Sequence, residues 1–144
     1  MSFLDTVKRV LEGFEWSRYG VGYAVVFGSA TQGSSKPRDV DIAISCLDRR
    51  CDSDTVLELY ASLSKLLEPS LGLSLDLVVL DWNPPCELVL EIYRNGVLIY
   101  EAFPGIYLED MVRRVLICYD WSLVEKKLRV LETAEEVVLS GYSH

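Results

Sequence analysis

Three aspartates of this chain stand within or directly before stretches that otherwise have the composition of buried strands. Asp39 and Asp41 open the stretch DVDIAIS (39–45), and Asp76 interrupts the apolar run of SLDLVVLD (74–81). Side chains two residues apart on a strand point to the same face, so Asp39 and Asp41 are expected side by side, with α-carbons about 7 Å apart. If the two strands are neighbours, all three carboxylates meet at one place.

The remaining residues of the first strand predict open space in front of the acids. Val40, Ile42 and Ile44 alternate with the aspartates and are expected to face the core. Ala43 and Ser45 continue the acid face with small side chains. The carboxylates are therefore expected to face a space that a ligand can occupy.

Clustered carboxylates repel one another unless cations lie among them. A site made only of oxygen ligands favours Mg²⁺ or Mn²⁺. Two such ions held about 4 Å apart are the usual device for in-line displacement at phosphorus. One ion lowers the pKa of the attacking hydroxyl and the other takes up charge on a triphosphate. Asp39, Asp41 and Asp76 thus predict a metal-dependent site for nucleotide chemistry.

The residues that precede the acids have the types that a phosphate site needs. Gly28 and Ser29 end the apolar run VGYAVVFG (21–28). Gly28 lets a phosphate approach the backbone, and Ser29 can hydrogen-bond it. Lys36 and Arg38 are the nearest cations and are candidates for neutralising a leaving pyrophosphate.

The elements that must position these residues alternate between helical and strand patterns. Together they predict an α+β chain, with one small mixed sheet covered by helices in a single domain. The predicted elements are a helix over 3–17, strands over 21–28, 39–45, 74–81 and 97–102, a helix from Ser53 or Asp54 that Pro69 and Gly72 end, a helix from Pro85 to about Arg94, and a helical tail over 108–139. Ser122 and Glu125 make a capping-box pattern that allows a break in this tail near Asp120.

Length and charge narrow the classes of function. The 144 residues carry 14 Lys and Arg against 22 Asp and Glu, for a formal net charge of −8. This balance argues against general nucleic-acid binding. No apolar run has the length of a membrane span, and the acidic, helix-periodic N-terminus does not resemble a signal peptide, so we expect a cytoplasmic protein.

The cysteines and the histidine offer little material for a metal or acyl-transfer site. Cys46, Cys51, Cys86 and Cys118 form no CxxC pair, and His144 is the last residue. Buried or half-buried thiols are the expectation for the four cysteines. A Cys46–Cys51 disulfide is the alternative that nearness in sequence leaves open.

The combined pattern resembles the DNA polymerase β-like nucleotidyltransferase superfamily, and in particular its minimal nucleotidyltransferases (MNT). The resemblance lies in Gly28-Ser29, a spacer, Asp39-Val40-Asp41 and the later Asp76, and it covers about residues 5–102. It implies transfer of AMP from ATP, with two Mg²⁺ or Mn²⁺ ions on the three aspartates. Asp76 would also help to deprotonate the acceptor hydroxyl.

The resemblance extends to the roles of the loop residues, with one departure. Gly28 and Ser29 would hold the triphosphate, with Lys36 and Arg38 nearby. Many relatives have serine directly before the first aspartate, where this chain has Arg38. That departure concerns the phosphate geometry of the loop more than the metal site.

The resemblance to minimal nucleotidyltransferases also implies an antitoxin that pairs with a small helical protein of the HEPN class. Such an antitoxin adds AMP to a tyrosine of that partner. The helical tail over 106–140 is too short for an acceptor domain of its own, which agrees with an acceptor on another molecule. Aromatic residues that could contact such a partner, or could instead pack on the sheet, are Trp82, Tyr93, Tyr107, Tyr119 and Trp121.

Two other functions remain open at this point. One is a non-catalytic module that keeps the fold and neutralises a partner by binding alone. The other is a small-molecule nucleotidyltransferase whose acceptor site is completed by homodimerisation.

Overall fold

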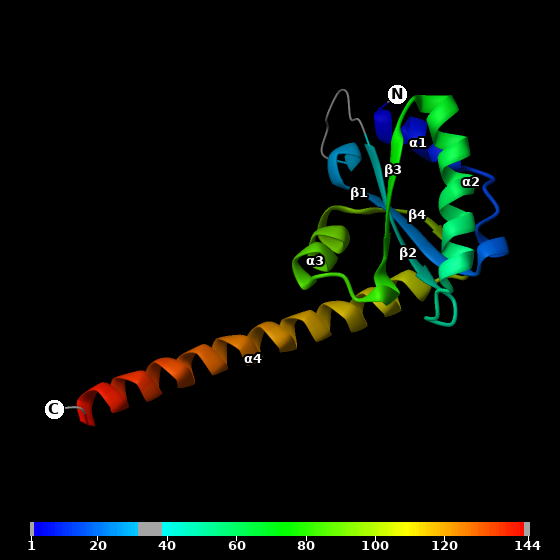
Figure 1. Ribbon diagram of the computed structural model, residues 1–144. Coiled ribbons are helices and arrows are strands. Elements are labelled where there is room, and N and C mark those ends of the chain that lie inside the picture. Colours follow the sequence, from blue (N-terminus) through cyan, green and yellow to red (C-terminus); the bar gives the residue numbers. More distant parts are fainter. Residues whose placement is uncertain (1, 32–38, 143–144) are drawn as a thin grey trace.

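The computed structural model describes residues 2–31 and 39–142, which form a four-stranded sheet with two helices packed on each face (Figure 1). Short 3₁₀ turns follow the first helix, the first strand and the third strand. The elements in chain order are α1 (Phe3–Leu11), η1 (Trp16–Tyr19), β1 (Val21–Phe27), η2 (Gly28–Thr31), β2 (Asp39–Cys46), α2 (Ser53–Leu71), β3 (Ser74–Val79), η3 (Leu80–Trp82), α3 (Cys86–Asn95), β4 (Val97–Glu101) and α4 (Ile106–Tyr142).

The sheet is mixed, as the sequence predicts. Its strand order is β3-β2-β1-β4, and β1 pairs antiparallel with both β2 and β4. Strands β2 and β3 are parallel neighbours, which confirms the adjacency on which the grouping of Asp39, Asp41 and Asp76 depends. The long helix α2 makes the connection that a parallel pair requires.

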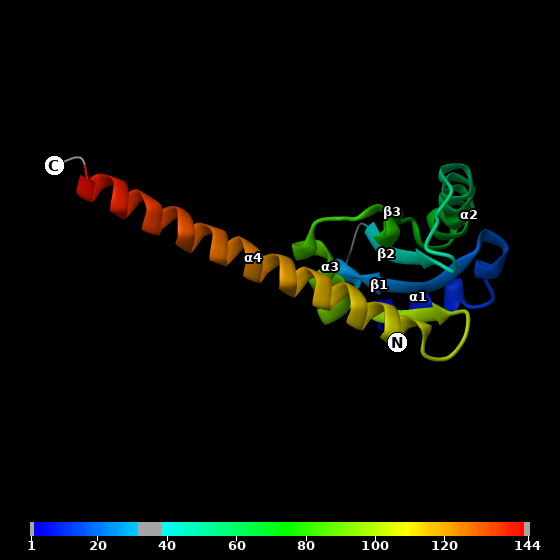
Figure 2. The same cartoon turned by 90° about the horizontal axis from the view of Figure 1, so that it is seen from below.

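Each face of the sheet has its own core. On one face, α1 and α2 pack against the inward side chains of β2, which include Val40, Ile42 and Ile44. On the other face, α3 and the start of α4 pack around Tyr23 and Ala43 (Figure 2). Alternation along β2 therefore sends its apolar residues to the α1–α2 side and its acids to the α3–α4 side.

The bounds of α1 and α2 differ from the sequence prediction, and α2 continues through Pro69 to Leu71 before Gly72 caps it. Helix α1 ends at Leu11 instead of residue 17, because Gly13 takes a left-handed conformation with φ of 84°. Trp16 then enters the core from a 3₁₀ turn. Helix α2 is capped by Asp52, whose side chain accepts from the backbone N–H of Thr55, one residue before the earliest predicted cap.

Helix α4 is continuous over 37 residues and extends far beyond the body of the molecule (Figures 1 and 2). The break that the capping-box pattern allows near Asp120 does not occur in this helix. No proline or glycine interrupts the helix before Gly141, and a capping residue such as Ser122 ends a helix only where the preceding backbone leaves helical geometry. Only the first turns of α4 are in a position to contact the sheet.

Candidate active site

The three predicted aspartates lie together at one end of β2 and β3. Asp41 is directly opposite Asp76 in the parallel register, and Asp39 precedes Asp41 on the same face of β2. Asp41 is half-buried, whereas Asp39 and Asp76 are exposed. We refer to Asp39, Asp41 and Asp76 as the acid edge.

The acid edge is a concentration of negative charge. Burial and the adjacent Asp76 carboxylate raise the pKa of Asp41 to about 6. The charges of Asp39 and Glu91 act in the same direction. Among the side chains that the structure describes, the ion pairs involve other acids and none includes a member of the acid edge.

Glu91 is a neighbour of this site that sequence reasoning missed. It lies on α3, in the strand-turn-helix segment that follows Asp76, and its side chain is exposed. Its place in the sequence carries no signal, because a surface glutamate on an amphipathic helix is ordinary. Only the packing of α3 on the acid face of the sheet brings its charge near Asp41.

Gly28 suits both its backbone conformation and the acid beside it. Its φ is 75°, and a β-carbon there would overlap Oδ2 of Asp41. Phe27, the residue before it, pairs with Asp41 across the β1–β2 ladder. The exposed Ser29 follows in the turn η2, where Thr31 donates a hydrogen bond to the Gly28 carbonyl at 2.9 Å. The glycine-serine pair and the acids thus share one edge of the sheet.

The other two predicted nucleotide-binding residues, Lys36 and Arg38, lie outside the described residues. Their role stays a prediction.

The residues of the acid edge fit a hard divalent cation. All of the donors are carboxylate oxygens, the ligand type that Mg²⁺ and Mn²⁺ prefer. The raised pKa of Asp41 agrees with the lack of a positive charge beside it among the described residues. A bound cation would supply it.

A second group of acids on the same face of the sheet is fully compensated. The side chain of Asp81 is 3% exposed and accepts hydrogen bonds from Arg114 Nη2 and, at 2.8 Å, from the backbone N–H of Cys46. Arg114 also donates through Nε to Asp110 at 2.8 Å and through Nη1 to the carbonyl of Leu80 at 2.8 Å. We refer to Asp81, Asp110 and Arg114 as the α4 clamp, because it ties α4 to the end of β3.

Hydrogen bonds hold the charges of the α4 clamp in place. Burial by itself raises the pKa of Asp110, but hydrogen bonds from Tyr23, Arg114 and Arg113 bring it below its ordinary value. The Tyr23 hydroxyl donates to Asp110 and also contacts the Tyr93 hydroxyl at 2.7 Å. Hydrogen bonds therefore connect the clamp through Tyr23 of β1 to Tyr93 of α3. The sequence analysis missed it, because Asp81 has the appearance of a strand end.

The four cysteines form two disulfides, so the expectation of free thiols is wrong. Cys46 is joined to Cys51, the alternative left open, with α-carbons 5.7 Å apart. Cys86 at the start of α3 is joined to Cys118 in α4, with α-carbons 5.5 Å apart. The second pairing spans 32 residues and follows only from the packing of the two helices.

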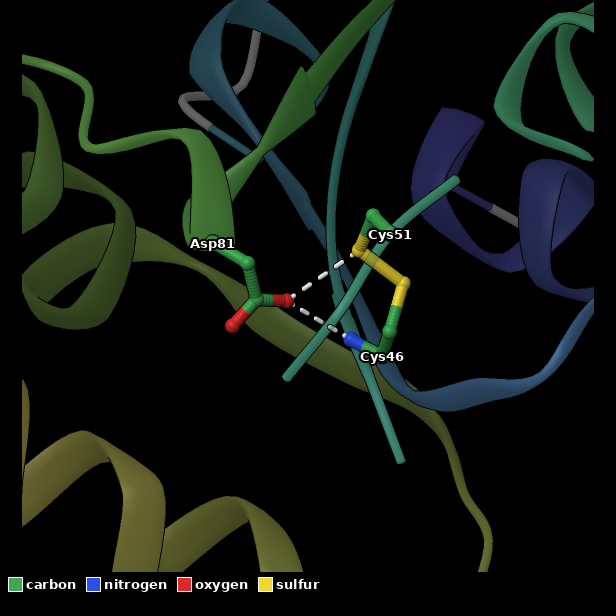
Figure 3. Close-up of side chains that lie close together, drawn as sticks. All are labelled: Cys46, Cys51 and Asp81. Atoms are coloured by element: carbon green, nitrogen blue, oxygen red, sulfur yellow. Dashed lines mark hydrogen bonds between the residues drawn. A yellow bond between two sulfur atoms is a disulfide. The ribbon is translucent and has the colours of Figure 1, made fainter. Parts of the chain in front are cut away.

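Figure 3 shows Asp81 beside the Cys46–Cys51 disulfide. The two sulfurs and the carboxylate lie within 4.8 Å of one another, a spacing that metal ligands can have. Disulfide sulfurs are not thiolate ligands, however, and Asp81 already pairs with Arg114. In this form the group is not a metal site.

The aromatic residues divide into packed and exposed sets. Tyr107 packs edge-on against Tyr23 with ring centroids 5.2 Å apart, and Tyr93 lies beside it, so these two pack on the sheet. Trp82 is 51% exposed and Tyr119 is 52% exposed. The side chain of Trp121 lies outside the described part of the chain.

Comparison with known proteins places this arrangement in a family. The family model described as polymerase beta, nucleotidyltransferase matches residues 12–103. No curated protein matches the chain. Among the helices that the structure describes, none combines the length and apolar character needed to cross a membrane.

Solved structures of low identity share the fold. A toxin–antitoxin structure with AMP-PNP aligns with a TM-score of 0.55 at 17% identity, over 92% of this chain and 96% of the other. The complex of tri-AMPylated Shewanella oneidensis HEPN toxin with MNT antitoxin gives a TM-score of 0.52 at 16% identity, over 92% and 94%. The toxin–antitoxin MntA–HepT gives 0.50 at 15%, over 92% and 95%. These likenesses confirm the predicted α+β fold.

Proposed function

The chain belongs to the polymerase β nucleotidyltransferase family, and on that premise we propose that it is an antitoxin that transfers AMP from ATP to a tyrosine hydroxyl of a HEPN-type toxin. The observation that carries the proposal is the acid edge, where Asp41 and Asp76 face each other across two parallel strands. The solved structures of similar fold support the acceptor, because one contains an AMPylated HEPN toxin and another contains AMP-PNP.

The roles of the residues follow from their places on the sheet. Asp39, Asp41 and Asp76 would hold two Mg²⁺ ions, which supply charge for the triphosphate and lower the pKa of the attacking hydroxyl. Asp76 is exposed and can accept the proton of the acceptor hydroxyl. Gly28 leaves the backbone open beside Asp41, and the exposed Ser29 can donate a hydrogen bond to a phosphate oxygen.

The test is transfer of label from ATP to the partner. The protein is incubated with Mg²⁺, ATP labelled at the α-phosphate, and the protein encoded beside it. We expect the partner to become labelled, and we expect Asp39→Asn to abolish this labelling. Asp54→Asn, which changes an exposed acid in the first turn of α2, is the matched control and should label normally. Absence of label with the unaltered protein would refute the proposal.

A binding-only antitoxin is a second candidate, which the surface of α4 favours. Leu108, Val112, Leu116 and Tyr119 are each about half exposed or more along this helix. Such a surface suits a protein partner. Neutralisation of the partner that survives both Asp39→Asn and Asp41→Asn would favour binding over transfer.

A further inference from the structure

The Cys46–Cys51 disulfide makes an unfavourable contact that its reduced form would not make. The Cys51 sulfur lies 3.2 Å from Oδ2 of Asp81, a buried carboxylate (Figure 3). A disulfide sulfur has no hydrogen to donate, whereas a thiol does. In the dithiol form the Cys51 thiol could donate a hydrogen bond to Asp81 while the Cys46 sulfur moves away from it. The carboxylate therefore favours the dithiol.

The same disulfide closes a ring that holds a strained residue. Arg49 lies between the two cysteines with φ of 59°, in the left-handed region. This conformation is costly for a residue with a β-carbon. Opening the ring would remove one constraint that holds it there.

We propose that Cys46–Cys51 is a reducible redox site, which a dithiol reductant opens while Cys86–Cys118 stays closed. The second disulfide serves as an internal comparison. It joins positions on two packed helices, α3 and α4, which keep the sulfurs close even when reduced. Neither cysteine of that pair is grouped with a carboxylate in the described part of the chain.

A cavity of about 430 Å³ gives a reductant access to the first disulfide. Its walls include Cys46, Cys51, Arg18 and Arg50. The two arginines are balanced there by Asp48 and Asp52, so the charge of the walls does not decide the approach of a thiolate. Cys86 and Cys118 also border a cavity, so access by itself does not separate the two disulfides. The two disulfides differ instead in the Asp81 carboxylate beside Cys51 and in the strained Arg49 within the ring.

The exchange is a two-electron transfer. One thiolate of the reductant attacks the half-buried Cys51 sulfur, the S–S bond breaks, and the buried Cys46 sulfur leaves as a thiolate that takes a proton. The second thiolate of the reductant then displaces the Cys51 sulfur. The reductant becomes a disulfide, and Cys46 and Cys51 become thiols.

The redox site is separate from the acid edge. Cys46 ends β2 and Asp41 is near its start, so five residue steps of strand, about 17 Å, separate them. The site adjoins the α4 clamp instead, through Asp81 and through Arg49, whose Nε is 4.0 Å from Asp110. Its redox state can be measured on the protein alone, independently of ATP, metal or partner.

The first experiment equilibrates the full chain with buffers of reduced and oxidised dithiothreitol. Free thiols are alkylated at each ratio and assigned by mass spectrometry. We expect Cys46–Cys51 to be half reduced at a ratio of reduced to oxidised dithiothreitol at least about fivefold lower than the ratio that half reduces Cys86–Cys118. This factor corresponds to the relief of one left-handed residue. Simultaneous opening, or earlier opening of Cys86–Cys118, would overturn the proposal.

The second experiment isolates the strain with two exposed residues of the same ring. Arg49→Gly relieves the left-handed conformation in the closed form and should make the disulfide about fivefold harder to reduce than in Arg50→Gly. Both variants add the same freedom to the open chain, so the difference reports the strain. Equal midpoints for the two variants would remove strain from the explanation and overturn the role given to Arg49.

Discussion

The acid edge and the α4 clamp lie on the same face of one sheet and differ in the charges around them. In the clamp, Asp81 and Asp110 share Arg114, and hydrogen bonds lower the pKa of Asp110. At the acid edge no described side chain supplies a cation, and the pKa of Asp41 is raised to about 6. The difference separates a group of carboxylates that stabilises the fold from a group for which the described residues supply no compensating charge, the group that we propose binds metal.

The largest effect is expected from breaking the clamp. Arg114→Met leaves Asp81 and Asp110 buried without their shared partner and should lower the free energy of unfolding by about 3–5 kcal/mol. Asp41→Asn should leave the stability of the metal-free protein unchanged or higher, because it removes a repelling charge. Urea denaturation measures both. Equal losses of stability in the two variants would contradict the division between a structural and a ligand-binding group.

A smaller effect is expected from Gly28→Ala at the acid edge. The left-handed backbone costs about 1–2 kcal/mol for alanine, and overlap with Asp41 adds to that cost. Gly20→Ala is the matched control, because Gly20 has φ of 66° and open space where a β-carbon would lie. Thermal denaturation should rank Gly28→Ala below Gly20→Ala. The difference in melting temperature between the two variants should disappear in an Asp41→Ala background. A difference that persists there would show that Asp41 is not its cause.

The smallest effect is a dependence of stability on pH that distinguishes the two groups. The raised pKa of Asp41 means that the folded protein binds more protons than the unfolded chain between about pH 4 and 6, so metal-free stability should fall as pH rises through this window. Because Asp41 is partly exposed, the fall is on the order of 1 kcal/mol. Asp110 acts oppositely: its lowered pKa adds stability that is present above about pH 4 and lost as the pH falls further.

This pH dependence is measured by urea denaturation in the presence of a chelator. Asp41→Asn should remove the fall between pH 4 and 6 and keep the loss at lower pH. A profile that is flat over pH 4 to 6 in the unaltered protein would show that the pKa of Asp41 is not raised.

Local pattern predicted the acid edge well and the helix ends less well. Alternation in DVDIAIS placed Asp39 and Asp41 on one face, and the adjacency of strands that would bring in Asp76 is confirmed. The predicted end of α1 was wrong because Gly13, inside an otherwise periodic stretch, decides it. The break that the sequence allows in α4 does not occur, because a capping pattern is permitted within a continuous helix.

Local sequence was sufficient to place the two acids on one face of a strand and to place a glycine at the end of the strand before them. Both depend on the period of two and on short-range sterics, which neighbouring residues settle. The meeting of Asp81 and Asp110 on Arg114, and of Cys86 with Cys118, depends instead on how distant elements pack. Periodicity reports which side of an element is buried but not which other element covers it, and α4 crosses the sheet where no local signal requires it.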